Sequence, residues 1–113
     1  MELDEYVTHD AVSLGHLVRN KIISPHELAK LATTATHIVN NKLNATVEIF
    51  ETPIVSDTIS SNAIFSGVPC FKKDLGTVIT GYGYESGSRL TTGIKSPVTD
   101  EFSKCMLTSG LQI

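Results

Sequence analysis

Apolar residues recur at helical spacing in the first part of the chain. Between residues 10 and 21, Val12, Leu14, Leu17 and Val18 gather on one face of a helix, and polar residues occupy the other face. This pattern predicts a short amphipathic helix over residues 10–21.

A second helix has a clear start signal. Ser24 is a good N-cap residue, Pro25 suits the first helical position, and Glu27 completes a capping box with Ser24. Asn40 and Asn41 provide the break that ends the pattern. The spacing therefore predicts a helix from this cap to about residue 41, with an apolar face made of Leu28, Leu31, Ala32, Ala35, Ile38 and Val39.

Two short segments have the composition of strands. Residues 45–50 are rich in β-branched side chains and carry one charge, at Glu48. Residues 68–73 have Pro69 near their start, where a missing backbone donor does least harm to a strand. Between these segments, residues 52–66 are weakly periodic and rich in Ser, Thr and Asn, which leaves a poor helix and a loop as alternatives.

The last third of the chain predicts a loop and then a helix. Residues 75–97 contain many Gly, Ser and Thr residues without periodicity, which is typical of a long ordered loop. Thr99 or Asp100 can cap a helix that carries Phe102 and Met106, and Gly110 can end it. The order helix, helix, strand, weak helix, strand, loop, helix predicts an α/β layer whose two strands need further strands to complete a sheet.

Composition excludes several classes of function. The chain has 113 residues, enough for about one small domain, and a net charge of −3 with no basic cluster, so nucleic acid is not an expected partner. It has no apolar run of membrane-spanning length, and its first residues are acidic where a secretion signal would be basic and then apolar. We therefore expect no membrane association and a cytoplasmic location.

No metal or cofactor is expected from the residue spacings. Cys70 and Cys105 lack a Cys-x-x-Cys spacing, which predicts reduced, buried cysteines of small apolar character. The four histidines, at positions 9, 16, 26 and 37, lack the spacing of a helical zinc site. The glycines at 81, 83 and 87 lack the Lys-Ser/Thr of a phosphate-binding loop, so a nucleotide-binding fragment ranks last among the alternatives.

Several short motifs follow one another in an order that resembles the amino-terminal part of amidase-signature hydrolases. The Lys-Asp-Leu-Gly and Gly-Ser-Arg-Leu forms are similar to the 6-aminohexanoate-cyclic-dimer hydrolase branch, within a family that also includes the A subunits of Glu-tRNA(Gln) amidotransferases. The motifs are Ser24-Pro25-His26-Glu27-Leu28, Leu43-Asn44-Ala45-Thr46-Val47, Gly67-Val68-Pro69, Lys73-Asp74-Leu75-Gly76, Gly87-Ser88-Arg89-Leu90 and Ser109-Gly110.

The resemblance implies a function and a fold. In that family the lysine before the aspartate is the base of a Ser–cis-Ser–Lys triad that hydrolyses amides, and Lys73 has this position. A lysine acts as a base near neutral pH only if its site lowers its pKa. The family fold is a mixed-sheet α/β/α sandwich, and both serines lie in a Gly/Ser-rich signature further along the chain. Residues 1–113 are then a partial amidase-like domain, cut short before that signature and inactive alone, whose small-molecule amide binds only if a downstream chain completes the site.

Each candidate residue also has an ordinary structural interpretation. Lys73 can be an exposed lysine at a strand end that pairs with Asp74. Lys72 departs from the family pattern, in which the preceding position is apolar, and a charge there is costly inside a sheet. Asp74 can fix the following loop by accepting backbone hydrogen bonds, or can be a solvated carboxylate. Ser88 lacks the sequence context of a nucleophile, and Cys70 lacks a base.

The alternative function is non-catalytic. A remnant of an amidase, or a small protein-binding module, would pair an exposed sheet edge with a partner chain or with a second copy of itself. This alternative predicts a stable folded dimer or complex. An isolated amidase fragment, whose strands belong in a larger sheet, would leave their edges open and would be marginally stable or prone to association.

Overall fold

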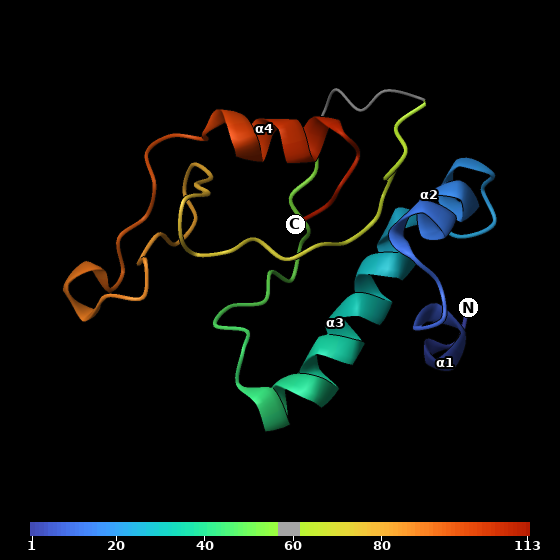
Figure 1. The fold of residues 1–113 in the computed structure, drawn as a ribbon, viewed down its shortest axis with the longest axis horizontal. Helices are drawn as coiled ribbons and strands as arrows, with labels where there is room; N and C mark the ends of the chain where they lie inside the picture. Colours follow the sequence, from blue (N-terminus) through green and yellow to red (C-terminus); the bar gives the residue numbers. More distant parts are fainter. Residues whose placement is uncertain (57–61) are drawn as a thin grey trace.

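The structure, a computed structural model, describes residues 1–56 and 62–113 (Figure 1). Four α-helices and one short 3₁₀ helix form in this part of the chain. They are α1 (Leu3–Tyr6), α2 (Ala11–Arg19), α3 (Pro25–Leu43), the 3₁₀ helix η1 (Arg89–Thr91) and α4 (Glu101–Thr108). No helix of the described residues is long and apolar enough to cross a membrane.

The three helices predicted from the sequence are present, and side-chain caps fix where they start. Asp10 accepts a hydrogen bond from the Ser13 N–H at 2.7 Å and caps α2. Ser24 and Glu27 form the predicted capping box at the start of α3, with Pro25 at its first position. These side chains satisfy backbone N–H groups that the first turn of a helix leaves without partners.

Helix α4 begins after Asp100, which settles the choice between Thr99 and Asp100 as its cap. The Asp100 carboxylate accepts a hydrogen bond from the Ser103 N–H at 2.7 Å. Gly110 follows the helix with a φ of 99°, a conformation that favours glycine. A Cβ on Gly110 would lie 2.8 Å from Cα of Ser66, so this turn is also too close to its neighbour for a side chain.

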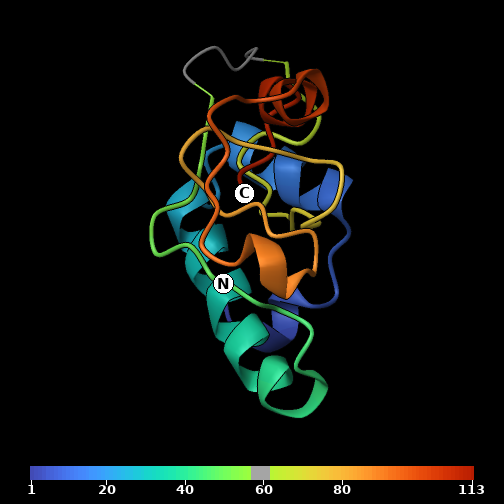
Figure 2. The same cartoon turned by 90° about the vertical axis from the view of Figure 1, so that its left-hand side faces the viewer.

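The sequence analysis missed α1, a single turn at the start of the chain. Its cap residue makes no side-chain hydrogen bond, and no apolar periodicity marks it. The turn lies beside α3 (Figure 2), and Met1 and Tyr6 pack against the core. Tertiary contact stabilises this short helix, which is below the length that forms alone in water.

The core lies where the first three helices meet residues 65–68. Its buried residues are Leu14, Ile23, Leu28 and Val68. Gly15 of α2 allows a close approach to the neighbouring backbone, because a Cβ there would lie 2.1 Å from the Ile64 carbonyl oxygen. The Arg19 guanidinium closes the same contact by donating to that carbonyl oxygen at 2.7 Å.

The predicted α/β fold is wrong, because the described residues form no strand or sheet. Both predicted strands, residues 45–50 and 68–73, are irregular in structure. The bridges among the described residues are isolated, a parallel one between Pro69 and Gln112 and an antiparallel one between Gly83 and Lys95, and Ile54 and Ile113 also exchange two backbone hydrogen bonds. Strand-forming composition becomes a strand only when a neighbouring segment offers a continuous row of hydrogen-bonding groups, and only single residues meet here.

The two segments predicted to be irregular, residues 52–66 and 75–97, agree in part with the structure. Residues 75–97 form the expected long loop, interrupted by η1, and Gly76, Gly81, Gly87 and Gly93 provide turns with positive φ. Residues 52–56 and 62–66 are not helical. The rest of the segment whose state the sequence left open, residues 57–61, lies outside the described residues.

Candidate functional site

A cleft of about 930 Å³ lies between helix α3 and three loop segments. This volume falls in the range of small-molecule sites. Residues 45–50 and 69–74, the two segments predicted as strands, both contribute to its lining, as do residues around the Gly83–Lys95 bridge. Its charged lining residues are Glu48, Lys72, Lys73, Asp74, Glu85 and Lys95.

Lys73 lies on the rim of this cleft. Its side chain is exposed, and its ammonium group forms no hydrogen bond or ion pair with any described residue. The expected pairing with Asp74 is therefore absent from this part of the chain. The backbone at Lys73 is nevertheless held, because its carbonyl oxygen accepts a hydrogen bond from the Thr77 hydroxyl.

The Lys72 ammonium group, unlike that of Lys73, has a hydrogen-bond partner among the described residues. Its half-buried side chain donates a hydrogen bond from Nζ to the Thr77 carbonyl oxygen at 3.1 Å. Thr77 thus bonds to both lysines, through its hydroxyl to Lys73 and through its carbonyl to Lys72. The charge of Lys72 causes no burial cost inside a sheet, because this residue lies in an irregular segment just before the turn at residues 74–76.

Asp74 holds the base of the long loop. Both of its carboxylate oxygens accept from the Glu85 N–H, at 3.1 and 3.2 Å, which matches the first of the two roles expected from the sequence. Glu85 in turn accepts a hydrogen bond from the Gly93 N–H at 2.7 Å through its own carboxylate. The carboxylates of Asp74 and Glu85 therefore connect residues 74, 85 and 93 through hydrogen bonds at one side of the cleft.

The Gly-Ser-Arg motif lies at the far end of this loop. Ser88 caps η1 by accepting from the Leu90 N–H at 3.3 Å, which is a structural role. Leu90 is 96% exposed. None of the serines that the structure describes lines the cleft, so it brings no serine nucleophile to Lys73.

The cysteines differ in their surroundings. Cys70 is half-buried in the lining of the cleft, and burial raises the pKa of its thiol, which disfavours the reactive thiolate. Cys105 is exposed, so the prediction that it is buried is wrong.

Two positioning roles were not found from the sequence: that of Gln112, and a second role of Asp100, which the sequence offered only as one of two possible caps of α4. Gln112 is buried and donates from its amide to the carbonyl oxygens of Gly67 at 2.6 Å and Pro25 at 2.8 Å. Its own N–H donates to Val68 O, and its carbonyl oxygen accepts from Cys70 N–H, which fixes the segment leading to Lys73. A single glutamine in an irregular segment carries no pattern that could reveal this role.

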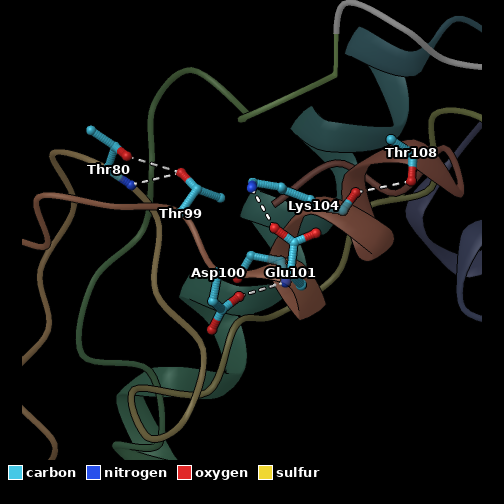
Figure 3. A network of polar contacts seen from close by, with 7 residues as sticks. Thr80, Thr99, Asp100, Glu101, Lys104 and Thr108 are labelled. Carbon is cyan, nitrogen blue, oxygen red and sulfur yellow. Dashed lines mark hydrogen bonds and ion pairs between the residues drawn. The ribbon is translucent and has the colours of Figure 1, made fainter.

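Asp100 is the second such residue; it lies at the start of α4 beside Thr99, which contacts Thr80 (Figure 3). Besides capping the helix, its carboxylate accepts from the Val78 N–H at 3.0 Å. The Ser103 N–H is the largest cause that holds the pKa of Asp100 below its ordinary value, and the Val78 N–H and the charge of Lys72 act in the same direction. Thr99 supports the same junction by accepting from the Thr80 N–H at 3.0 Å.

Comparisons of the chain with protein-family models, with curated proteins and with solved structures found no match. The resemblance to amidase-signature hydrolases therefore stays a prediction from the sequence motifs.

Proposed function

We propose that this chain supplies the lysine base of an amide-hydrolase site of the Ser–cis-Ser–Lys type, and that polypeptide outside residues 1–113 supplies the two serines. The observation that carries the proposal is the placement of Lys73. Its ammonium group, which has no partner among the described residues, lies on the rim of a cleft of small-molecule size whose described lining has no serine.

Amide hydrolysis needs an oxygen nucleophile and a group that removes its proton and later protonates the leaving amine. The ammonium group of Lys73 has no partner among the described residues, so it is open to bonding with the serines of the completing polypeptide. Covering of the cleft by that polypeptide would exclude water, and removal from water favours the neutral, basic form of a lysine. The Thr77–Lys73 and Gln112–Cys70 hydrogen bonds hold the backbone on both sides of this position. The amide substrate would occupy the apolar part of the cleft, next to the lysine.

The first test is to sequence the transcript through and beyond the codon for Ile113 and to translate all three frames. The proposal expects a Gly/Ser-rich segment with two serines, in frame, in another frame or behind a stop codon. Unrelated sequence in all three frames would overturn the proposal of a continuous or divided amidase and would favour the non-catalytic binding module.

The second test is kinetic and uses the longest product of that transcript. Lys73→Ala is expected to lower the rate of hydrolysis of simple amides by about 10²- to 10⁴-fold, the usual contribution of a general base, and to abolish labelling of the serine by a fluorophosphonate. Lys95→Ala is the matched control, because Lys95 is also an exposed lysine lining the cleft. Equal activity of the two variants would show that Lys73 is not the base.

A further inference from the structure

Residues 85–93 form a compact arm on the rim of the cleft. The Glu85 carboxylate accepts a hydrogen bond from the Gly93 N–H at 2.7 Å, which holds the two ends of the arm together. Inside the arm, the Thr91 hydroxyl donates to the carbonyl oxygens of Glu85 and Ser88. A short loop whose ends meet and whose side chains bond to its own backbone is a unit of structure, and such loops frequently have a function.

The arm is attached to the cleft through a stem of two short segments, residues 82–84 and 94–96. The Gly83–Lys95 bridge pairs the two segments, and the Tyr82 ring lies 4.6 Å from the Phe50 ring between their centroids, which holds the stem against residues 45–50. Both ends of the arm, Glu85 and Gly93, line the cleft. The arm itself projects outward (orange in Figure 1). A bend at its base would therefore bring its tip over the cleft.

One side chain holds the arm in this outward position. Among the described residues, Asp74 is the one residue outside the arm and the stem that forms a hydrogen bond with the arm, through the Glu85 N–H at 3.1 and 3.2 Å. Gly93, at the other end, has a φ of 79°, and a Cβ there would meet no atom within 4 Å. This glycine serves the conformation of the backbone and not close packing, which suits a hinge.

The tip of the arm and the mouth of the cleft both expose apolar side chains. Leu90, at the tip, is 96% exposed, and Val47 and Phe71, from two segments that line the cleft, are 92% and 70% exposed. Side chains as exposed as Leu90 and Val47 do not cover each other, so the outward position leaves both in water. Contact between them would remove apolar surface from water, which is favourable.

We propose that residues 85–93 are a lid that closes over the cleft, with Leu90 packed against Val47 and Phe71, and that the Asp74–Glu85 hydrogen bond is the latch that holds the lid open. Closing breaks this bond and turns the backbone at Gly93. A closed lid excludes water from the site beneath it. The consequence for catalysis rests on the proposed function, whereas the movement does not, so its test needs no activity and can fail while the proposed function stands.

The test traps the closed lid with a disulfide between Val47→Cys and Leu90→Cys in the full chain. Cys70→Ser and Cys105→Ser leave the two introduced thiols alone, and copper phenanthroline with dissolved oxygen is the oxidant. A disulfide requires the two Cα atoms to come within about 7 Å of each other. At low protein concentration we expect an intrachain disulfide, detected as the mass of a single chain that has lost two hydrogens.

The control pairs Leu90→Cys with Val12→Cys. Val12 is also exposed, but it lies on α2 and does not line the cleft, so no intrachain disulfide is expected. Absence of the disulfide between positions 47 and 90, or its formation at the same rate in the control pair, would overturn the lid.

Two substitutions of Asp74 test the latch in the chain that carries cysteines at positions 47 and 90. Asp74→Ala removes the acceptor for the Glu85 N–H, so the disulfide should form about tenfold faster, as expected for loss of one hydrogen bond to a charged group. Asp74→Asn keeps a carbonyl oxygen that can accept the same bond, so its acceleration should be smaller. A rate that is unchanged in Asp74→Ala would overturn the latch.

Discussion

Two adjacent lysines have separate roles because their side chains point to different surroundings. The Lys72 ammonium donates to the Thr77 carbonyl oxygen and lies near the Asp100 carboxylate, whose pKa it helps to lower. The Lys73 ammonium has no partner among the described residues. The first lysine therefore contributes to the stability of the turn, and the second leaves its charge available at the cleft.

This difference predicts a larger effect on stability at Lys72 than at Lys73. Lys72→Ala should lower the free energy of unfolding by about 1 kcal/mol, because it removes a half-buried hydrogen bond. Lys73→Ala should change it by less than about 0.5 kcal/mol, since surface changes without partners are usually neutral. Chemical denaturation of the two variants checks this, and an equal loss in both would mean that Lys73 has a structural partner.

At the scale of elements, side-chain caps determine where the helices begin. Asp10, Ser24 with Glu27, and Asp100 each accept hydrogen bonds from N–H groups of a first helical turn. Carboxylates at these positions also interact favourably with the helix dipole. Asp100 differs from the other caps because it also accepts from Val78, so that the start of α4 is joined to the segment that follows the lysines.

The charge of Asp100 predicts a pH dependence of stability. Its pKa in the folded chain lies below its ordinary value of 3.8, first because the Ser103 N–H bonds to the carboxylate. Its contribution is therefore fully present above this ordinary value and is lost as the pH falls through the lower, folded pKa. Asp100→Asn keeps a good N-cap residue but cannot titrate, so stability measured during acid titration should fall less steeply than in the unchanged chain.

The stability of Asp100→Asn should still fall at low pH, because two other helix-capping carboxylates titrate in the same range. Asp10 and Glu27 also have lowered pKa values, caused first by the Ser13 N–H for Asp10 and by the Ser24 side chain for Glu27. Identical acid titration curves for Asp100→Asn and the unchanged chain would show that the Asp100 carboxylate contributes no charge-dependent stability.

At the scale of the whole molecule, the core is small and lies at one end. The extents of 45 × 34 × 18 Å describe a flat body, in which α4 lies apart from the helices that pack around Leu28 (Figure 1). Leu28 is the largest apolar side chain that is fully buried. Much of the remaining apolar surface, including Val47 and Phe71, faces solvent.

A core of this size predicts strong dependence on single residues. Leu28→Ala should lower the free energy of unfolding by about 3 kcal/mol, the cost of an apolar cavity at a fully buried leucine. This loss is a large fraction of the roughly 5–15 kcal/mol by which small proteins are usually stable. Ile38→Ala is the control, because Ile38 lies on the same helix but is 55% exposed. Comparable losses in the two variants would show that Ile38 is covered in solution.

The sequence by itself determined the local structure that short-range chemistry specifies. Apolar periodicity and caps located α2, α3 and α4, since a cap bonds to a backbone group three residues away and needs no distant partner. The turn-forming glycines of the long loop were likewise expected from the sequence. These features depend on residue type and close spacing alone.

Tertiary structure decided what depends on neighbours distant in the sequence. Residues 45–50 and 68–73 have the composition of strands but meet only single residues of other segments, so no sheet forms in the described chain. The partners of Lys72, Asp100 and Gln112 come from other segments, and no residue pattern marks them in advance. Pairing between segments is a property of the folded arrangement, because it requires two stretches of chain to arrive at hydrogen-bonding distance.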